Sequence, residues 1–340
     1  MNVLALFSGC GGMDLGFTKA GGQIVWANDI DKDAVNTYQK NLGGHIVCKD
    51  IYQVDPNDAP DDVDVVVGGF PCLGFTLAKG KHRNVVNENN ILYKQYIKVL
   101  EKKLPKYFLI ENVPGMKSGV EFNTFFQQMI NDFENVGINE EKTKFKGYRL
   151  KHEILLASDY GVPQNRKRLI IIGTRNDLEI EPAYPKPTHS KQGDPNNNLH
   201  HHITLEKAIG DLPNDFDMSV PNHVGTNLKV KINQFVGNRK LDWSKPAPTI
   251  TGRGSRSGGA VIHPHPNCER RLSIRECARL QTFPDNFVFI GSNGANYAHI
   301  GNAVPPILAF HIAKEFKRII DGVEVEFNPK DWDLPWLKEC

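Results

Sequence analysis

The sequence predicts an α/β fold in which a wound sheet is followed by a smaller, irregular region. Short apolar runs alternate with stretches of helical periodicity from residue 3 to about residue 175, a pattern typical of strands connected by helices. The composition changes near residue 180. From there to about residue 285 the chain is rich in proline, asparagine, histidine and glycine and has little periodicity. A length of 340 residues suits two domains, or one large domain with an insertion.

Apolar runs and amphipathic stretches give the individual elements of this fold. The runs are short and apolar, as buried strands are, whereas the stretches between them repeat at helical spacing. The expected strands are Val3–Phe7, Gln23–Ala27, Val63–Val67, Tyr107–Ile110 and Leu169–Ile172. The expected helices are Lys32–Asn41, Ile91–Lys103 and Phe122–Val136, together with a last helix over Ile307–Ile320 that begins at a proline pair and packs back on the sheet.

Charge and cysteine content limit the classes of protein that this chain can represent. A formal net charge of +2 neither demands nor excludes a polyanionic partner. Six scattered cysteines are too few for a disulfide-stapled secreted domain, so we expect reduced thiols and a cytoplasmic protein. No apolar run is long enough to span a membrane. His200–His202 have no acidic or cysteine partner nearby, and we expect a polar loop there and no metal site.

Strand ends in the first third of the chain indicate a cofactor with an adenosyl group. The first strand ends in Phe7–Gly12, whose glycines permit a tight turn and close backbone approach to a ligand, although a plain turn is the alternative. Asp29 follows the second strand, where an acidic residue usually binds a ribose. Asp50 and Ile51 could flank an adenine ring, and Asp50 could equally cap a turn. The next glycine after Gly12 is Gly16, which argues against a nicotinamide cofactor.

Cys72 is the first candidate nucleophile. The run Val63–Val67 continues through two glycines and Pro71 to this cysteine, and the carboxyl ends of strands are where ligands bind in an open parallel sheet. A thiol with a pKa of about 8.5 is only a few per cent ionised at neutral pH, yet its thiolate is very nucleophilic. We expect Cys48 and Cys277 to be buried and inert.

Two further strand ends carry charged groups. Tyr107–Ile110 leads into Glu111, whose carboxyl group could protonate or hydrogen-bond a heterocyclic nitrogen, or else cap the next helix. Arg166 and Arg168 stand at alternate positions where a strand begins and therefore share a face. Their guanidinium groups suit a phosphate or a base oxygen, with a solvated basic edge as the alternative.

In this order, these blocks resemble the DNA (cytosine-5)-methyltransferases that use S-adenosylmethionine. The matching blocks span Leu6 to Ala309 and are Phe7–Gly12, Gly68–Thr76, Glu111–Val113, Gln164–Arg168, Arg271–Pro284 and Gly301–Pro305. The resemblance implies the Rossmann-like sheet of methyltransferases with helices on both faces. It also implies a catalytic and cofactor-binding domain over residues 1–183, a target-recognition domain over 184–285, and a segment over 286–340 that returns to the first domain.

The resemblance implies a mechanism on a cytosine that has left the DNA stack, because the thiol must reach the ring from above. Cys72 would add to C6 while Glu111 binds the N3 and amino edge, and Arg166 and Arg168 would hold the base. C5 would then accept the methyl group, after which the C5 proton and the Cys72 thiolate leave.

The same resemblance assigns residues to the cofactor and to DNA. Those implied for the cofactor are Phe7, Ser8, Gly9, Gly11, Gly12, Asp29, Ile30, Asp50, Ile51, Pro71 and Asn302. Those expected for DNA are Lys81 and Arg83 in a mobile loop, Thr249 and Thr251, and Arg253 and Arg256, although Gly252–Gly259 could instead be a flexible connection. Two residues depart from the family pattern: Leu73 stands in place of the usual glutamine, and Thr76 in place of a common serine.

Double-stranded DNA is the expected partner, and a monomer suffices to flip one base. A compact chain of this kind suits a restriction-modification role beside a cognate endonuclease, without a stable complex. The closest rival is a transfer-RNA cytosine-5 methyltransferase with the same Cys72 and Glu111, but the length of the recognition region favours DNA. A catalytically silent DNA-binding protein and a dehydrogenase are weaker rivals. The recognition sequence does not follow from the residues, because base contacts depend on loop geometry.

Overall fold

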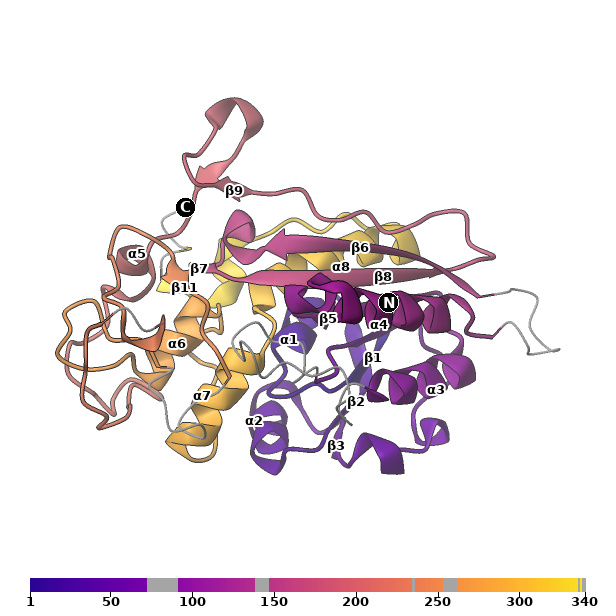
Figure 1. Ribbon diagram of the computed structural model, residues 1–340, viewed down its shortest axis with the longest axis horizontal. Helices are drawn as coiled ribbons and strands as arrows, with labels where there is room; N and C mark the ends of the chain where they lie inside the picture. Colours follow the sequence, from indigo (N-terminus) through magenta and orange to yellow (C-terminus); the bar gives the residue numbers. More distant parts are fainter. Residues whose placement is uncertain (72–90, 138–146, 234–235, 253–261, 336, 338–340) are drawn as a thin grey trace.

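A seven-stranded sheet organises the first half of the chain (Figure 1). The computed structural model describes residues 1–71, 91–137, 147–233, 236–252, 262–335 and 337. The order of the strands is β3-β2-β1-β4-β5-β8-β6. Their bounds are Asn2–Leu6 for β1, Gln23–Asp29 for β2, Ile46–Cys48 for β3, Val65–Gly68 for β4, Tyr107–Asn112 for β5, Tyr148–Leu156 for β6 and Lys167–Arg175 for β8.

The five strands β1 to β5 run parallel, and β8 is antiparallel to both of its neighbours, β5 and β6. All five strands expected from the sequence are present, so the α/β prediction is confirmed. Two strands were not predicted. β3 has only three residues, and β6 lies at the edge of the sheet with charged residues such as Lys151 and Glu153 among its apolar ones, which hides it from a search for apolar runs.

Helices cover both faces of the sheet, as the predicted fold requires. Successive strand residues point to opposite faces, so Val3 and Ala5 of β1 belong to one hydrophobic cluster and Leu4 and Leu6 to the other. The first cluster is completed by helices α1 (Gly12–Lys19), α2 (Lys32–Leu42) and α8 (Pro306–Asp321), and the second by α3 (Tyr93–Lys103) and α4 (Val120–Glu134). The expected return of the last helix to the sheet is thus confirmed.

The antiparallel strand β8 fits against β5 because Gly173 leaves room for an aromatic ring. Gly173 pairs with Phe108 of β5, and a Cβ atom on this glycine would overlap the Phe108 ring. Gly173→Ala is therefore expected to lower the free energy of unfolding by about 2–4 kcal/mol, measured by urea denaturation. Gly44→Ala is the control, since nothing lies within 4 Å of its added Cβ. Equal losses in the two variants would contradict this packing argument.

The region after residue 184 is mostly irregular, as expected, and gathers at one end of the sheet (Figure 1). Its helices are short: α5 spans Leu205–Ile209, α6 spans Ile274–Leu280 and α7 spans Asn293–Asn302. Two small ladders accompany them, β9 (His189–Ser190) with β10 (His200–His201) and β7 (Gln164–Asn165) with β11 (Ala247–Pro248). Buried residues of this region, including Leu205, Leu272 and Phe283, share one hydrophobic cluster with the sheet.

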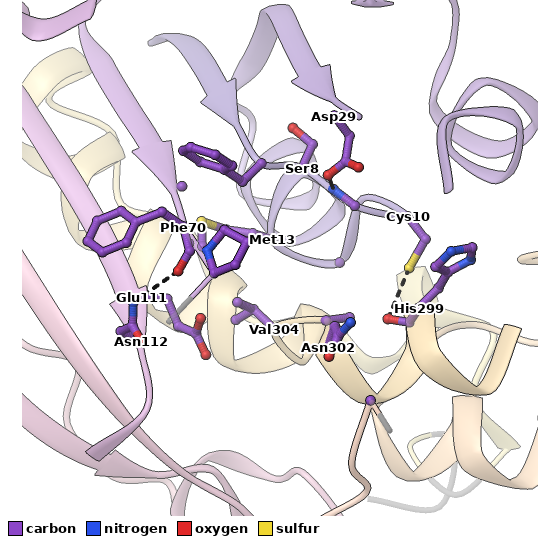
Figure 2. Close-up of a pocket in the computed structure, with 18 of the residues that line it drawn as sticks. Ser8, Cys10, Met13, Asp29, Phe70, Glu111, Asn112, His299, Asn302 and Val304 are labelled. Carbon is purple, nitrogen blue, oxygen red and sulfur yellow. Dashed lines mark hydrogen bonds between the residues drawn. The ribbon is translucent and has the colours of Figure 1, made fainter. Parts of the chain in front are cut away.

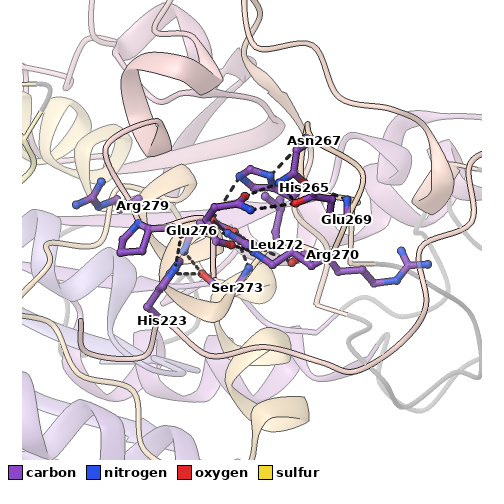
Figure 3. Close-up of polar contacts among 12 residues, drawn as sticks. His223, His265, Asn267, Glu269, Arg270, Leu272, Ser273, Glu276 and Arg279 are labelled. Carbon is purple, nitrogen blue, oxygen red and sulfur yellow. Dashed lines mark hydrogen bonds and ion pairs between the residues drawn. The ribbon is translucent and has the colours of Figure 1, made fainter. Parts of the chain in front are cut away.

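Polar contacts around α6 hold much of this irregular region together (Figure 3). Ser273 and Glu276 form a capping box at the start of the helix, and Arg270 pairs with Glu276 at 2.6 Å. His223, from a distant loop, lies 3.0 Å from the Ser273 hydroxyl. The buried Arg275 donates to three backbone carbonyl groups of two loops, those of Pro221, Pro284 and Phe287. Charged side chains therefore satisfy the carbonyl groups that regular secondary structure would otherwise have paired.

Two expectations about side chains were wrong. Cys48 is exposed, because it ends the short strand β3, whereas Cys277 is buried as expected. His200 and His201 form β10, and His202 Nε2 lies 2.8 Å from Asp159 Oδ1, so an acidic partner is present after all. The sequence gives no sign of it because Asp159 precedes His202 by 43 residues. Within the described ranges, no three His, Cys, Asp or Glu residues gather as a metal site would require.

Candidate active site

A cavity of about 1130 Å³ opens at the carboxyl ends of β1, β2, β4 and β5 (Figure 2). Most of the predicted site residues that the structure describes line it: Phe7, Ser8, Gly9, Gly12, Asp29, Ile30, Asp50, Ile51, Pro71, Glu111, Arg166, Arg168, Thr249, Thr251 and Asn302. Gly11 does not line it and lies beneath the loop, where a φ of 92° and the side chains of Tyr38 and Leu42 leave space only for glycine. Cys72, Leu73, Thr76, Lys81, Arg83, Arg253 and Arg256 lie outside the described residues.

The ends of β4 and β5 are held together on one side of this cavity. Asn112 Nδ2 donates to the carbonyl oxygen of Phe70 at 3.1 Å, and a Cβ on Gly69 would lie 3.0 Å from Glu111 Oε2. The absence of a side chain at Gly69 thus lets the segment that follows β4 run beside the end of β5. As a result, Pro71 and Glu111 line the same cavity although they lie in different strand ends.

Glu111 forms a nearly buried ion pair. Arg168 Nε lies 2.6 Å from Glu111 Oε1, and the two side chains are 12% and 10% exposed. Burial lowers the pKa of Arg168, and Glu111 opposes that shift. The alternative in which Glu111 caps the next helix fails, because Val113 precedes the short helix over Pro114–Lys117 without a side-chain cap. The pair instead holds one carboxylate oxygen and leaves the other beside Gly69.

Arg166 is fully buried and acts as a link between segments. Its guanidinium group donates to the carbonyl oxygens of Ile250, Gly301 and Ala303 at 2.8–3.0 Å. Gln164, two residues earlier, accepts from the Ile250 backbone N–H at 2.8 Å. These bonds join the start of β8 to Ile250 of the irregular region and to the chain at Gly301–Ala303, and all three parts contribute to the cavity wall.

The glycine-rich loop is locked to the end of β2. Phe7 adopts a φ of 55°, a left-handed conformation that costs about 1–3 kcal/mol for a residue other than glycine and is typical of functional sites. This turn lets Gly9 N donate to Asp29 Oδ2 at 2.7 Å. Burial raises the pKa of Asp29. Asp29 therefore positions the loop itself, a role that the spacing of the sequence did not indicate.

Two residues expected to contact the adenosyl group, Ile30 and Asp50, line the cavity just beyond β2 and β3. Asp50 accepts from Tyr52 N at 3.0 Å and so caps a short helix over Ile51–Gln53, while also lining the cavity. The capping alternative for Asp50 is thus confirmed, and its position at the cavity leaves the contact with an adenine ring as a prediction. Ile30 lines the cavity and is 65% exposed, so it presents a solvent-exposed apolar surface there.

Several polar groups of the cavity wall have no partner among the described residues. Ser8 Oγ, Asp14 Oδ2, Thr251 Oγ1 and His299 Nδ1 are buried without a hydrogen bond, and His299 Nε2 has only the ion-pair contact with Asp31 at 3.2 Å. Buried polar groups are rarely left unpaired. Their concentration at this cavity therefore fits a polar ligand that supplies the missing bonds. Asp14 and His299 lie just outside the recognised blocks Phe7–Gly12 and Gly301–Pro305, and no spacing indicated that their side chains reach the cavity.

Asp14, near the start of α1, makes the stability of the ligand-free protein depend on pH. Burial raises the pKa of Asp14 to about 7, although the nearby Tyr38 and Ser8 hydroxyls oppose this shift. The Asp14 carboxyl group therefore keeps its proton to a higher pH in the folded protein than in the unfolded chain. As a result, the free energy of unfolding falls as the pH rises from about 4 to 7. Asp14→Asn removes this loss and is expected to be more stable at pH 8 by up to about 4 kcal/mol.

Urea unfolding of wild type and Asp14→Asn between pH 5 and pH 8 measures this difference. The advantage of the variant should shrink steadily toward pH 5, where the wild-type carboxyl group keeps its proton in the folded state. A difference that stays constant over this range would show that Asp14 does not titrate there.

The fold and the cavity define a Rossmann-like α/β enzyme whose site lies at the carboxyl edge of the sheet. Residues 1–318 match the family model of the C-5 cytosine-specific DNA methylases. The chain belongs to this family, and it is a DNA (cytosine-5)-methyltransferase with DNA as its substrate. Among the described residues, no helix combines the length and the apolar character needed to cross a membrane.

Relatives agree with this assignment, and solved structures share the fold. The chain is 36% identical to the type II methyltransferase M.MthTI of Methanothermobacter thermautotrophicus, over 95% of this chain and 99% of that protein. It is 34% identical to M.NgoFVII of Neisseria gonorrhoeae, over 92% and 85%. A putative DNA modification methyltransferase from an Escherichia coli prophage has a similar fold, with a TM-score of 0.70 at 24% identity over 94% and 99% of the chains. The S. pombe Dnmt2 methyltransferase superposes with a TM-score of 0.63 at 19% identity, over 94% and 99%.

Proposed function

We propose that the cavity binds S-adenosylmethionine beside a flipped-out cytosine of double-stranded DNA, and that Cys72 attacks C6 of this base. One observation carries the proposal: the glycine loop with Asp29 and the Glu111–Arg168 pair line a single cavity. A cofactor and a base held there would be neighbours. When bound, S-adenosylmethionine supplies an electrophilic methyl group. The unpaired Ser8 and His299 groups and the apolar surface of Ile30 suit its polar and adenine parts.

The proposed nucleophile follows directly on the described wall of the cavity. Pro71 lines the cavity, and Cys72 is the next residue in the sequence. Addition of the thiolate to C6 makes C5 electron-rich and ready to accept a methyl group. Loss of the C5 proton and departure of the thiolate then restore the ring and the enzyme.

Glu111 is proposed to hold the N3 and amino edge of the cytosine. Its carboxyl group can donate a proton toward N3 as negative charge develops there, which is general acid catalysis. Arg168 orients this carboxyl group through the 2.6 Å ion pair. For Arg166 we propose an indirect part in holding the base, because its guanidinium group bonds to three backbone carbonyls that shape the cavity.

The remaining proposed contacts concern DNA and the biological setting. Thr251 Oγ1 is buried without a partner at the cavity, whereas the Thr249 hydroxyl already donates to Asn165 O at 2.9 Å. This difference makes Thr251 the better candidate for a DNA contact. Both relatives named above are called type II methyltransferases. We therefore propose that this enzyme modifies one specific site as a monomer and protects DNA from a cognate endonuclease without forming a stable complex with it.

Expression in a host that lacks DNA methylation tests the proposal. Genome-wide mapping of 5-methylcytosine should show modification at one short sequence, and the map would also reveal that sequence. Calorimetric titration of the purified protein with S-adenosylmethionine tests the cofactor separately. Unmodified DNA from a folded protein that binds the cofactor would overturn the proposed reaction, and methylated transfer RNA in the same cells would favour the rival substrate.

A further inference from the structure

His299 is a buried side chain of the cavity wall that none of the proposed steps uses. It lies on α7, one turn before Asn302, and both residues line the cavity (Figure 2). The side chain is only 7% exposed, and neither ring nitrogen has a hydrogen-bond partner of normal geometry among the described residues. Such a group is costly to bury. A ligand in the cavity would remove that cost.

The position of His299 is set by two segments that are expected to hold the cofactor. The Cys10 thiol of the glycine loop lies 3.7 Å from the His299 carbonyl oxygen. His299 Nε2 lies 3.2 Å from Asp31 Oδ1, just beyond β2. Asp31 is itself fixed, because the same oxygen accepts from Asp33 N and Ala34 N as the cap of α2. The ring therefore stands between the glycine loop and a fixed carboxylate.

The charges around the ring favour a positive group at this place. Asp31 lies 3.2 Å from the His299 ring, and Asp29 is a second carboxyl group nearby, whose pKa burial raises against the opposing effect of His299. Burial would raise the pKa of Asp31, but the N–H groups of Ala34 and Asp33 and the imidazole hold it below its usual value. Asp14 adds a third carboxyl group to the same wall. With Nε2 directed at Asp31, Nδ1 is the ring nitrogen left for a ligand, and it is a donor whenever both ring nitrogens carry hydrogen.

The other cationic side chains of the cavity are already engaged or lie on other segments. Arg166 bonds to backbone carbonyl groups, and Arg168 pairs with Glu111. Lys49 lies beside Asp50 in sequence and pairs with Asp58 at 3.6 Å. Lys167 belongs to β8. Of the described residues at the glycine-loop end, His299 is thus the cationic group available to an anionic part of a ligand.

We propose that His299, positioned by Asp31, donates a hydrogen bond from Nδ1 to the carboxylate of the amino-acid end of the adenosyl cofactor. This inference rests on the proposed S-adenosylmethionine site. The methionine end is its anionic part, and the glycine loop is where that end is expected to lie. A contact there fixes the amino-acid chain, which carries the reacting sulfur, so His299 contributes to specificity for the complete cofactor over truncated adenosine compounds.

Two ligands that differ only in the amino-acid end test the contact. S-Adenosylhomocysteine carries the carboxylate, and 5′-methylthioadenosine lacks the whole end. Calorimetric titration of His299→Gln should show S-adenosylhomocysteine bound about tenfold or more weakly than by wild type, since hydrogen bonds to charged groups are worth about 1.5–3 kcal/mol. Binding of 5′-methylthioadenosine should stay within about twofold, because the removed group does not reach it.

Asp31→Asn is the second variant, because asparagine still caps α2 but lacks the charge that positions the ring. This variant should also bind S-adenosylhomocysteine more weakly than wild type does, but the loss of affinity should be smaller than in His299→Gln. His201→Gln, on the exposed strand β10, is the matched control and should leave both ligands unaffected. The inference would be overturned if His299→Gln lost affinity equally for both ligands, or if it lost affinity for neither. If wild type bound neither ligand, the proposed cofactor itself would be wrong.

Discussion

Cys72→Ala is expected to abolish methyl transfer to DNA while leaving cofactor affinity within about twofold. The variant lacks the nucleophile that activates C5, and removal of a catalytic nucleophile costs about four orders of magnitude or more in rate. The cofactor contacts proposed here come from the glycine loop, β2 and α7, none of which depends on this thiol. Transfer of a radiolabelled methyl group to DNA measures the rate, and calorimetry measures the affinity.

A mechanism-based trap separates a lost nucleophile from a merely weakened enzyme. Duplex DNA with 5-fluorocytosine at the target should remain bound covalently to wild type in the presence of S-adenosylmethionine, because fluorine cannot leave C5 as the proton does. Cys72→Ala should form no adduct that survives denaturing electrophoresis. Cys48→Ala is the matched control, since Cys48 is an exposed thiol at the end of β3. An equally strong adduct with Cys72→Ala would refute the assigned nucleophile.

Glu111→Gln is expected to lower the turnover number by about 10²–10⁴-fold, the range of general acid catalysis. Glutamine keeps the shape of the side chain and can still bond to the base, but it cannot give a proton to N3. Affinity for the cofactor should change little, because Glu111 lies on the opposite side of the cavity from Asp29 and the glycine loop (Figure 2). Single-turnover rates at saturating DNA and cofactor isolate this step.

The ion pair makes a stability control necessary for this variant. Glu111→Gln leaves the guanidinium group of Arg168 nearly buried without its carboxylate, and a broken buried pair is destabilising. Thermal unfolding of the variant shows whether enough folded enzyme remains at the assay temperature. Glu153→Gln, on the exposed part of β6, is the matched control and should be fully active. A Glu111→Gln enzyme within about threefold of wild type would exclude the acid role.

Local patterns in the sequence predicted most of the sheet and the most reactive groups. The five apolar runs became strands β1, β2, β4, β5 and β8 because uninterrupted apolar residues can only be buried between two layers of helices. Strand β6 was missed because an edge strand keeps charged residues. The exposure of Cys48 was missed because the solvation of a short strand depends on its neighbours rather than on its own residues.

The sequence by itself determined the succession of strand, turn and candidate site residue at Phe7–Gly12, Gly68–Pro71 and Glu111. A parallel sheet carries such strand ends to one edge, so their meeting in one cavity follows from the fold. Only the tertiary structure decided the partners of these groups, such as Arg168 for Glu111 and Asp31 for His299. The physical reason is that these contacts join segments far apart in the chain, and long-range packing rather than local periodicity selects which side chains meet.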